Sequence, residues 1–126
     1  YATALKLAGV PQPKDRIVDG VDLSPILFGS GPSPRRSMFY YRGTRLMAVR
    51  KGPWKAHFIT QPGYGGKAGE THDPPLLYHL EHDPGETTDL AKDHADAIED
   101  IRRLVMAHRA QLTPVSSQLE IPLPKR

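Results

Sequence analysis

Apolar and polar residues alternate along the middle of the chain with a period of two, which is typical of strands half-buried in a sheet. The alternation predicts strands over residues 38–42, 46–50 and 54–59, separated by tight turns at Gly43-Thr44 and Lys51-Gly52-Pro53. Alternate residues of a strand point to opposite faces. In the third strand, one face receives Trp54, Ala56 and Phe58, and the other receives Lys55, His57 and Ile59.

A fourth strand is predicted around residues 76–80, where Leu76, Tyr78 and Leu80 alternate with Leu77 and His79. The prolines at 74 and 75 mark where this strand is expected to begin. The following Asp83-Pro84-Gly85-Glu86 has the composition of a type II turn, in which Gly85 takes the positive φ of the third position.

The last apolar pattern has the period of a helix. Ile98, Ile101, Val105 and Leu112 recur on one stripe, which Leu104 widens. Arg102, Arg103 and Arg109 lie mostly off that stripe. The helix is expected to start at Asp93, whose carboxylate would cap the amide of Asp96. Together these elements indicate an α+β fold, with three or four antiparallel strands covered on one face by one helix.

The compact part is expected to occupy residues 31–112. The chain has 126 residues and 13 prolines, which crowd residues 11–34 and 113–124, so both proline-rich flanks are expected to be extended. Residues 1–30 are expected to be the tail of a preceding domain and a linker, and residues 113–126 an extended tail. Within 1–30, the first nine residues are typical of a helix end closed by Gly9, and the chain is expected to be truncated. A single turn capped by Asp22 or Ser24 is expected to present Leu23, Ile26 and Leu27 to a core.

Charge is unevenly distributed. Residues 35–67 hold eight lysines and arginines and no acid, whereas residues 70–100 hold ten acids against Lys92 alone. One half therefore forms a cationic surface that the other half can pair with. Residues 61–73 contain four glycines and little apolar content, and they are predicted to form a long loop.

Candidate chemistry from composition is limited. The sequence contains no cysteine, which excludes disulfides and a cysteine nucleophile. His79 and His82, with His72 nearby, lack a convincing carboxylate partner, so surface histidines are favoured over a metal site. Basic strands interleaved with aromatics also suit single-stranded nucleic acid, but the alternation of Trp54 and Phe58 with polar residues favours a core role. No apolar run has the length of a membrane span.

Three stretches, in this order, resemble the C-terminal region of arylsulfatase A-like enzymes: VDGVDLSPILFGSGPSPRRSMFYYRG, LMAVRKGPWKAHFITQ and DPPLLYHLEHDPGETTDLA. The resemblance extends from Leu7 to about Ala91, and the opening YATALKLAGVPQP is similar to the last helix of that family's large catalytic domain. It implies a sulfuric ester hydrolase of alkaline phosphatase-like architecture, exported from the cytoplasm, whose missing N-terminal catalytic domain is the partner of this chain.

The family's reaction uses a formylglycine and a calcium ion, and the resemblance implies both in the missing domain and neither in this chain. The nucleophile motif is Cys-x-Pro-x-Arg or its serine form. Residues 30–35 are a near miss, because Pro34 stands where the arginine is required. No catalytic residue and no metal ligand is therefore expected here.

The resemblance implies instead that this chain supplies part of the substrate-pocket wall, for a sulfated small molecule or saccharide. The candidate substrate-binding residues are Lys55, His57, Tyr64, Lys67 and His72. An alternative role for Lys55 and His57 is to pair with the catalytic domain across an interface. The alternative function for the whole chain is a free-standing basic module that binds anionic polymers or single-stranded nucleic acid.

Overall fold

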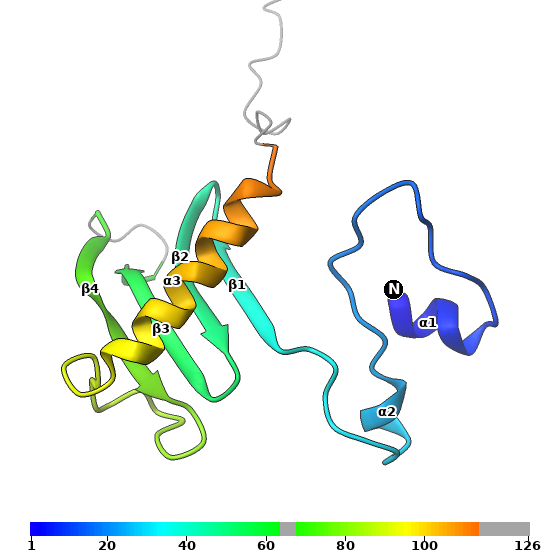
Figure 1. The fold of residues 1–126 in the computed structure, drawn as a ribbon, viewed down its shortest axis with the longest axis horizontal. Coiled ribbons are helices and arrows are strands. Elements are labelled where there is room, and N and C mark those ends of the chain that lie inside the picture. Colours follow the sequence, from blue (N-terminus) through cyan, green and yellow to red (C-terminus); the bar gives the residue numbers. More distant parts are fainter. Residues whose placement is uncertain (64–67, 114–126) are drawn as a thin grey trace, which may run out of the picture.

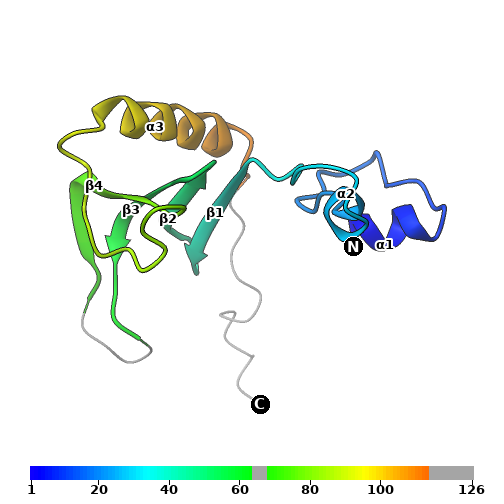
Figure 2. The same cartoon turned by 90° about the horizontal axis from the view of Figure 1, so that it is seen from below.

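A computed structural model describes residues 1–63 and 68–113. Two short helices, α1 (Ala2–Leu7) and α2 (Ser24–Leu27), come first, followed by strands and a long helix. The strands are β1 (Ser37–Arg42), β2 (Arg45–Lys51), β3 (Trp54–Thr60) and β4 (Glu70–His79), and the helix is α3 (Ala95–Ala110). The strands form one antiparallel sheet in the order β1-β2-β3-β4. α3 lies across one face of it, which confirms the expected α+β fold with four strands (Figures 1 and 2).

The core lies between α3 and the sheet. Val49, Ala56 and Leu77 are register partners on three adjacent strands and are fully buried. The buried cluster consists of Leu46, Val49, Ala56, Leu77, Ala91, Ala97, Ile98, Ile101 and Val105, with Phe39, Trp54, Phe58 and Leu104 packed against it. Trp54 and Phe58 therefore face the helix, as their alternation predicts.

The ends of α3 differ from the prediction. The helix begins after His94, with no side-chain cap, and the expected Asp93 cap is wrong. The amides of Asp93 and His94 both donate to the carbonyl of Leu90, so a preceding turn holds Asp93 away from the capping position. At the other end the helix stops at Ala110, and Leu112 lies beyond it, 46% exposed, instead of on the buried stripe.

β4 begins at Glu70, well before the prolines that were expected to mark its start. Pro74 and Pro75 lie inside the strand, which tolerates them because β4 is an edge strand with only one neighbour. The pairing with β3 is irregular between His57 and Ile59, close to the prolines. The loop after β3 is consequently shorter than expected, since residues 70–73 belong to the strand.

The turn after β4 places its positive φ one residue later than predicted. The amide of Glu86 donates to the carbonyl of Asp83, as expected of a turn, but Glu86 itself has a φ of 54°, and Gly85 is not in the left-handed region. The type II assignment is therefore wrong. The Asp83 carboxylate accepts the amides of Thr87 and Thr88, which fixes the chain on the far side of Glu86.

The first thirty residues lie beside the sheet, beyond β1 (Figure 1). Within the described residues, α1 and α2 contact each other and no other helix or strand. Neither Asp22 nor Ser24 is the predicted cap, because Leu23 is the N-cap of α2 and no side chain caps the helix. The Asp22 carboxylate does accept the amide of Ser24, and Gly29 ends the turn at a φ of +66°. The apolar side chains of this turn are not in a core, contrary to the prediction, because Leu23, Ile26 and Leu27 are all exposed.

No helix of the described chain is apolar and long enough to span a bilayer.

Candidate functional site

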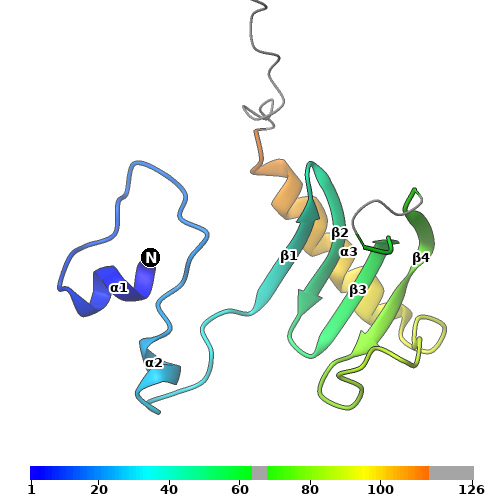
Figure 3. The same ribbon diagram turned by 180° about the vertical axis from the view of Figure 1, so that it is seen from behind.

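The face of the sheet that α3 leaves uncovered carries the candidate site (Figure 3). Strand alternation sends Lys55 and His57 to this face, because their neighbours Trp54, Ala56 and Phe58 point toward the helix. The register then adds their partners on adjacent strands. These are Ala48 opposite His57 on β2, and Tyr78 opposite Lys55 on β4.

Glu86 bonds both of the β3 candidates, Lys55 and His57. Its carboxylate accepts a hydrogen bond from the Lys55 ammonium at 2.6 Å, and its second oxygen lies 2.5 Å from Nε2 of His57. The three side chains are only 16%, 19% and 26% exposed, in the order Lys55, His57, Glu86. Burial on its own raises the pKa of the Glu86 carboxyl, but the hydrogen bonds and charges of Lys55 and His57 outweigh burial and hold this pKa below its usual range.

Two tyrosines surround this cluster. The Lys55 ammonium lies 5.0 Å from the centre of the Tyr40 ring, within the range of a cation–π contact. The His57 ring meets Tyr78 edge to face, with centroids 5.6 Å apart. Burial, together with the carboxylates of Asp89, Glu86 and Asp83, raises the pKa of the Tyr78 hydroxyl. Tyr78 therefore stays a neutral hydroxyl beside the cluster.

A hollow of about 340 Å³ opens next to the cluster. It is lined by Tyr40, Met47, Ala48, Lys55, His57, Ile59, Thr60 and Gln61. The predicted residue His72 does not reach Lys55 or His57 directly, but its Nε2 lies 2.8 Å from the hydroxyl of Thr60 at the rim of the hollow. Tyr64 and Lys67 lie outside the described residues. We call the lined space the Lys55–His57 hollow.

Three residues of this site were not predicted from the sequence. Glu86 lies 29 positions beyond His57 and Tyr40 lies 15 positions before Lys55, while Tyr78 was assigned only to a strand. Only the strand register could have brought Tyr40 and Tyr78 into the site. No local signal marks Glu86 as the partner of Lys55 and His57 on β3.

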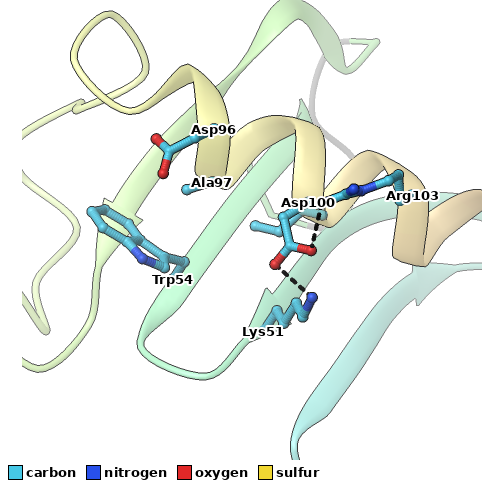
Figure 4. Close-up of a pocket in the computed structure, with 7 residues that line it drawn as sticks. Lys51, Trp54, Asp96, Ala97, Asp100 and Arg103 are labelled. Atoms are coloured by element: carbon cyan, nitrogen blue, oxygen red, sulfur yellow. Dashed lines mark hydrogen bonds and ion pairs between the residues drawn. The ribbon is translucent and has the colours of Figure 1, made fainter.

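A second hollow, of about 320 Å³, lies on the helix side of the sheet (Figure 4). Trp54 and Asp96 form part of its wall. Its charges are internally paired, because the Asp100 carboxylate bonds Lys51 at 2.5 Å and Arg103 at 3.3 Å. The Lys51–Asp100 pair links β2 to α3, whereas the Asp100–Arg103 pair lies within α3. The lining holds two cations and two carboxylates, which leaves little net charge for a ligand.

The remaining histidines have structural contacts. His79 and His82 stack with ring centroids 4.1 Å apart, and His79 also meets the edge of Trp54. His94 also contacts Trp54, with ring centroids 4.6 Å apart, and His108 stacks on Phe39. In residues 1–63 and 68–113, no three His, Cys, Asp or Glu side chains are arranged to hold a metal ion.

Comparison with known proteins shows which family the chain belongs to. The family model described as the C-terminal region of aryl-sulfatase matches residues 33–123, which is more than half of the chain. The chain belongs to this aryl-sulfatase family. The resemblance inferred from the sequence is thereby confirmed, and nothing in the comparisons supports a free-standing binding module.

Curated relatives cover nearly all of the chain. It is 35% identical over 144 residues to N-acetylgalactosamine-6-sulfatase of Canis lupus familiaris, covering 96% of the chain and 27% of that protein. It is 38% identical over 136 residues to arylsulfatase A of Homo sapiens, covering 94% of the chain and 25% of that protein. The chain thus spans about a quarter of the length of the curated relatives it matches.

Solved structures share the fold. A Bacteroides thetaiotaomicron protein from a locus for metabolism of multiple glycosaminoglycans superposes with a TM-score of 0.67 at 26% identity, covering 87% of this chain and 24% of that one. The PsFucS1 sulfatase from Pseudoalteromonas sp. superposes with a TM-score of 0.75 at 22% identity, with the same coverages. At 22% identity, the second likeness shows the fold alone.

Proposed function

We propose that this chain is the C-terminal part of a sulfuric ester hydrolase and that its open sheet face forms one wall of the substrate pocket. The observation that carries the proposal is the pairing of Lys55 and His57 with one carboxylate, beside a hollow that α3 leaves uncovered. In a chain of this family, such a wall is suited to orient a sulfate ester. The catalytic domain is proposed to lie upstream of residue 1, with residues 1–30 as its last part.

The role of this wall is binding and orientation. Lys55 has three N–H donors and uses one on Glu86, so two remain for the oxygens of a sulfate group. His57 contacts Glu86 through Nε2, and its other ring nitrogen, Nδ1, takes no part in that contact. Because Glu86 compensates the charge of Lys55, directed hydrogen bonds contribute more than net charge to anion binding here.

The calcium ion and formylglycine expected of the family do not fit the residues of this chain. The full sequence has no cysteine, and the described residues offer no three-ligand metal group. Both groups are proposed to reside in the catalytic domain, and the role of Lys55 and His57 does not depend on either. The substrate is proposed to be a sulfated sugar or an aryl sulfate, by analogy with relatives named N-acetylgalactosamine-6-sulfatase and arylsulfatase A.

The first expected outcome concerns the chain alone. The purified 126-residue chain should not hydrolyse an aryl sulfate, because it has no cysteine or matching serine motif from which to form the nucleophile. The measurement is release of p-nitrophenol from p-nitrophenyl sulfate, compared with a mock preparation. Turnover above the mock level would show that this chain holds its own catalytic group.

The second outcome tests the wall directly. In the longer protein, His57→Ala should raise KM for a sulfated substrate by about tenfold, the effect of losing one charge-assisted hydrogen bond. A modest fall in Tm is expected as well, since the bond to Glu86 is also lost. The control is His82→Ala, which removes an exposed histidine outside the hollow. Unchanged KM with a large fall in Tm would instead assign His57 to an interface with the catalytic domain.

A further inference from the structure

The open face of the sheet carries another hollow, which lies beside the Lys55–His57 hollow and is larger. Its volume is about 520 Å³, and it lies between the segment before β1 and the open faces of β1 and β2. Its lining consists of Pro32, Ser33, Arg35, Arg36, Ser37, Met38, Tyr40, Arg50, Gly52, Pro53 and Glu81. We call it the arginine groove. It is distinct from the Lys55–His57 hollow, but Tyr40 lines both.

The groove is cationic and only partly neutralised. Three arginines line it against the single carboxylate of Glu81. Arg35 donates to the carbonyl of Asp19, and Arg50 donates to the carbonyl of Gly52, both uncharged acceptors. Among the ion pairs of the described chain, none involves Arg35, Arg36 or Arg50. Because a guanidinium has five N–H donors, single bonds to carbonyls leave most of this donor capacity unused.

The two hollows form a continuous strip across the sheet. Arg50 on β2 is the register partner of Lys55 on β3, and Met38 on β1 is the partner of Arg50. Neighbouring strands lie about 4.8 Å apart, so a cation on one strand is followed closely by a cation on the next. The strip therefore offers anion-binding groups at both ends and a tyrosine ring at the junction.

We propose that the arginine groove is a subsite for a second anionic group of a sulfated saccharide chain whose cleavable sulfate ester lies in the Lys55–His57 hollow. This rests on the proposed function and narrows its substrate class. An aryl sulfate carries one anionic group and cannot occupy both ends of the strip. A sulfated oligosaccharide can, because it carries several anionic groups, and the polar residues Ser33 and Ser37 are part of the groove lining. Nucleic acid fits less well, because Tyr40 is the only aromatic in the groove lining, whereas single strands are bound by successive stacking platforms.

The test measures binding to the 126-residue chain itself by isothermal titration calorimetry. The probes are a dextran sulfate tetrasaccharide, glucose 6-sulfate and oligo(dT), and near-UV circular dichroism verifies folding of each variant. Arg36→Gln should weaken tetrasaccharide binding about three- to fivefold, the upper range for exposed charge pairs, and Arg36→Gln with Arg50→Gln about tenfold or more. Glu81→Gln should strengthen binding. The matched control is Arg109→Gln, an exposed arginine on α3, which should leave the affinity within about twofold.

Two results would overturn the subsite. If Arg109→Gln weakens tetrasaccharide binding as much as Arg36→Gln does, the effect comes from overall charge and not from the groove. If oligo(dT) binds as tightly as the tetrasaccharide and is weakened equally by the same variants, the groove has no preference for saccharides. If Arg50→Gln disturbs the turn at Gly52, Arg36→Gln alone still decides, since no hydrogen bond or ion pair of the described chain involves the Arg36 side chain.

The outcome is separable from the proposed function. If the longer protein hydrolyses p-nitrophenyl sulfate but the chain does not bind the tetrasaccharide, the subsite fails and the proposed function stands. If the chain binds the tetrasaccharide through the arginines but the longer protein hydrolyses no sulfate ester, the proposed function fails instead.

Discussion

At the scale of single residues, Glu86 concentrates several physical constraints. Its φ of 54° is uncommon for a residue with a side chain, and the strain is of order 1 kcal/mol or more. Its carboxylate, however, satisfies Lys55 and His57 together in a partly buried site. These two contacts offset the backbone strain. Propensity alone places the positive φ on Gly85, because nothing local to the turn indicates that Glu86 is held from β3.

The depressed pKa of Glu86 predicts how stability depends on pH. A carboxyl whose pKa is lower in the folded state than in the unfolded state contributes stability above its unfolded pKa and loses it as pH falls through the folded value. We therefore expect this contribution to be present at neutral pH. It should fade as the pH falls below 4.5, the ordinary pKa of a glutamate carboxyl. Glu86→Gln should cost about 1–3 kcal/mol at pH 7, because it leaves the partly buried Lys55 ammonium and the His57 ring without their carboxylate partner.

Thermal melts of wild type and variant at pH 7 and below pH 4 would measure both effects. The difference between Glu86→Gln and wild type should shrink on acidification. Gln keeps the shape and the backbone strain of Glu, so the comparison isolates the charge. Glu99→Gln, on the exposed surface of α3, is the control and should change stability by less than about 0.5 kcal/mol at either pH. A difference that stays constant from pH 7 to the lowest pH measured below 4 would disprove the assigned role of Glu86.

At the scale of secondary structure, periodicity located the strands and the helix but not all their ends. Trp54, Ala56 and Phe58 face α3 as their alternation predicts, because one apolar face must be buried for a sheet to be stable. The start of β4 was missed because prolines were interpreted as a boundary, whereas an edge strand accommodates them. The start of α3 was missed because Asp93 is bonded into the preceding turn.

The candidate site was predictable to the same extent as the sheet. Alternation placed Lys55 and His57 together on the face opposite Trp54, and they do share the hollow there. Their pairing with Glu86 depends on where the chain returns after β4, which is a tertiary property. His72 was expected in a loop and lies instead in β4, bonded to Thr60. Sequence periodicity therefore finds residues on one face, but not the partners that cross between elements.

The packing of α3 on β3 can be tested through Trp54, the only tryptophan of the chain. Trp54→Ala should cost about 3 kcal/mol, the lower end for large aromatic truncations in cores, because Trp54 is partly buried and packs against the cluster beneath α3. Urea unfolding followed by circular dichroism measures this cost. Met106→Ala on the exposed face of α3 is the control and should cost less than about 0.5 kcal/mol. Iodide should quench the wild-type fluorescence only in part, and complete quenching would contradict this packing.

At the scale of the whole molecule, the described chain has one well-buried core and one segment that lacks one. The sheet and α3 share the buried cluster, whereas residues 1–30 expose a series of large apolar side chains. These include Tyr1, Leu7, Ile17, Ile26, Leu27 and Phe28. Exposed apolar side chains gathered in one short segment are typical of a surface that another part of a protein covers. We propose that the catalytic domain of the longer protein covers them.

A substitution at Phe28 tests whether a catalytic domain covers this segment in the longer protein. Phe28 is 69% exposed in the chain, so Phe28→Ser should change the stability of the 126-residue chain by less than about 0.5 kcal/mol. In the longer protein the same change should cost about 3 kcal/mol or more, because the ring would be removed from a packed interface. Differential scanning calorimetry of both proteins measures the contrast. Met106→Ser, at a residue 62% exposed on α3, is the matched control and should be neutral in both. An equally small effect of Phe28→Ser in the longer protein would mean that the catalytic domain packs elsewhere, and the open sheet face would then be the surface on which to look for it.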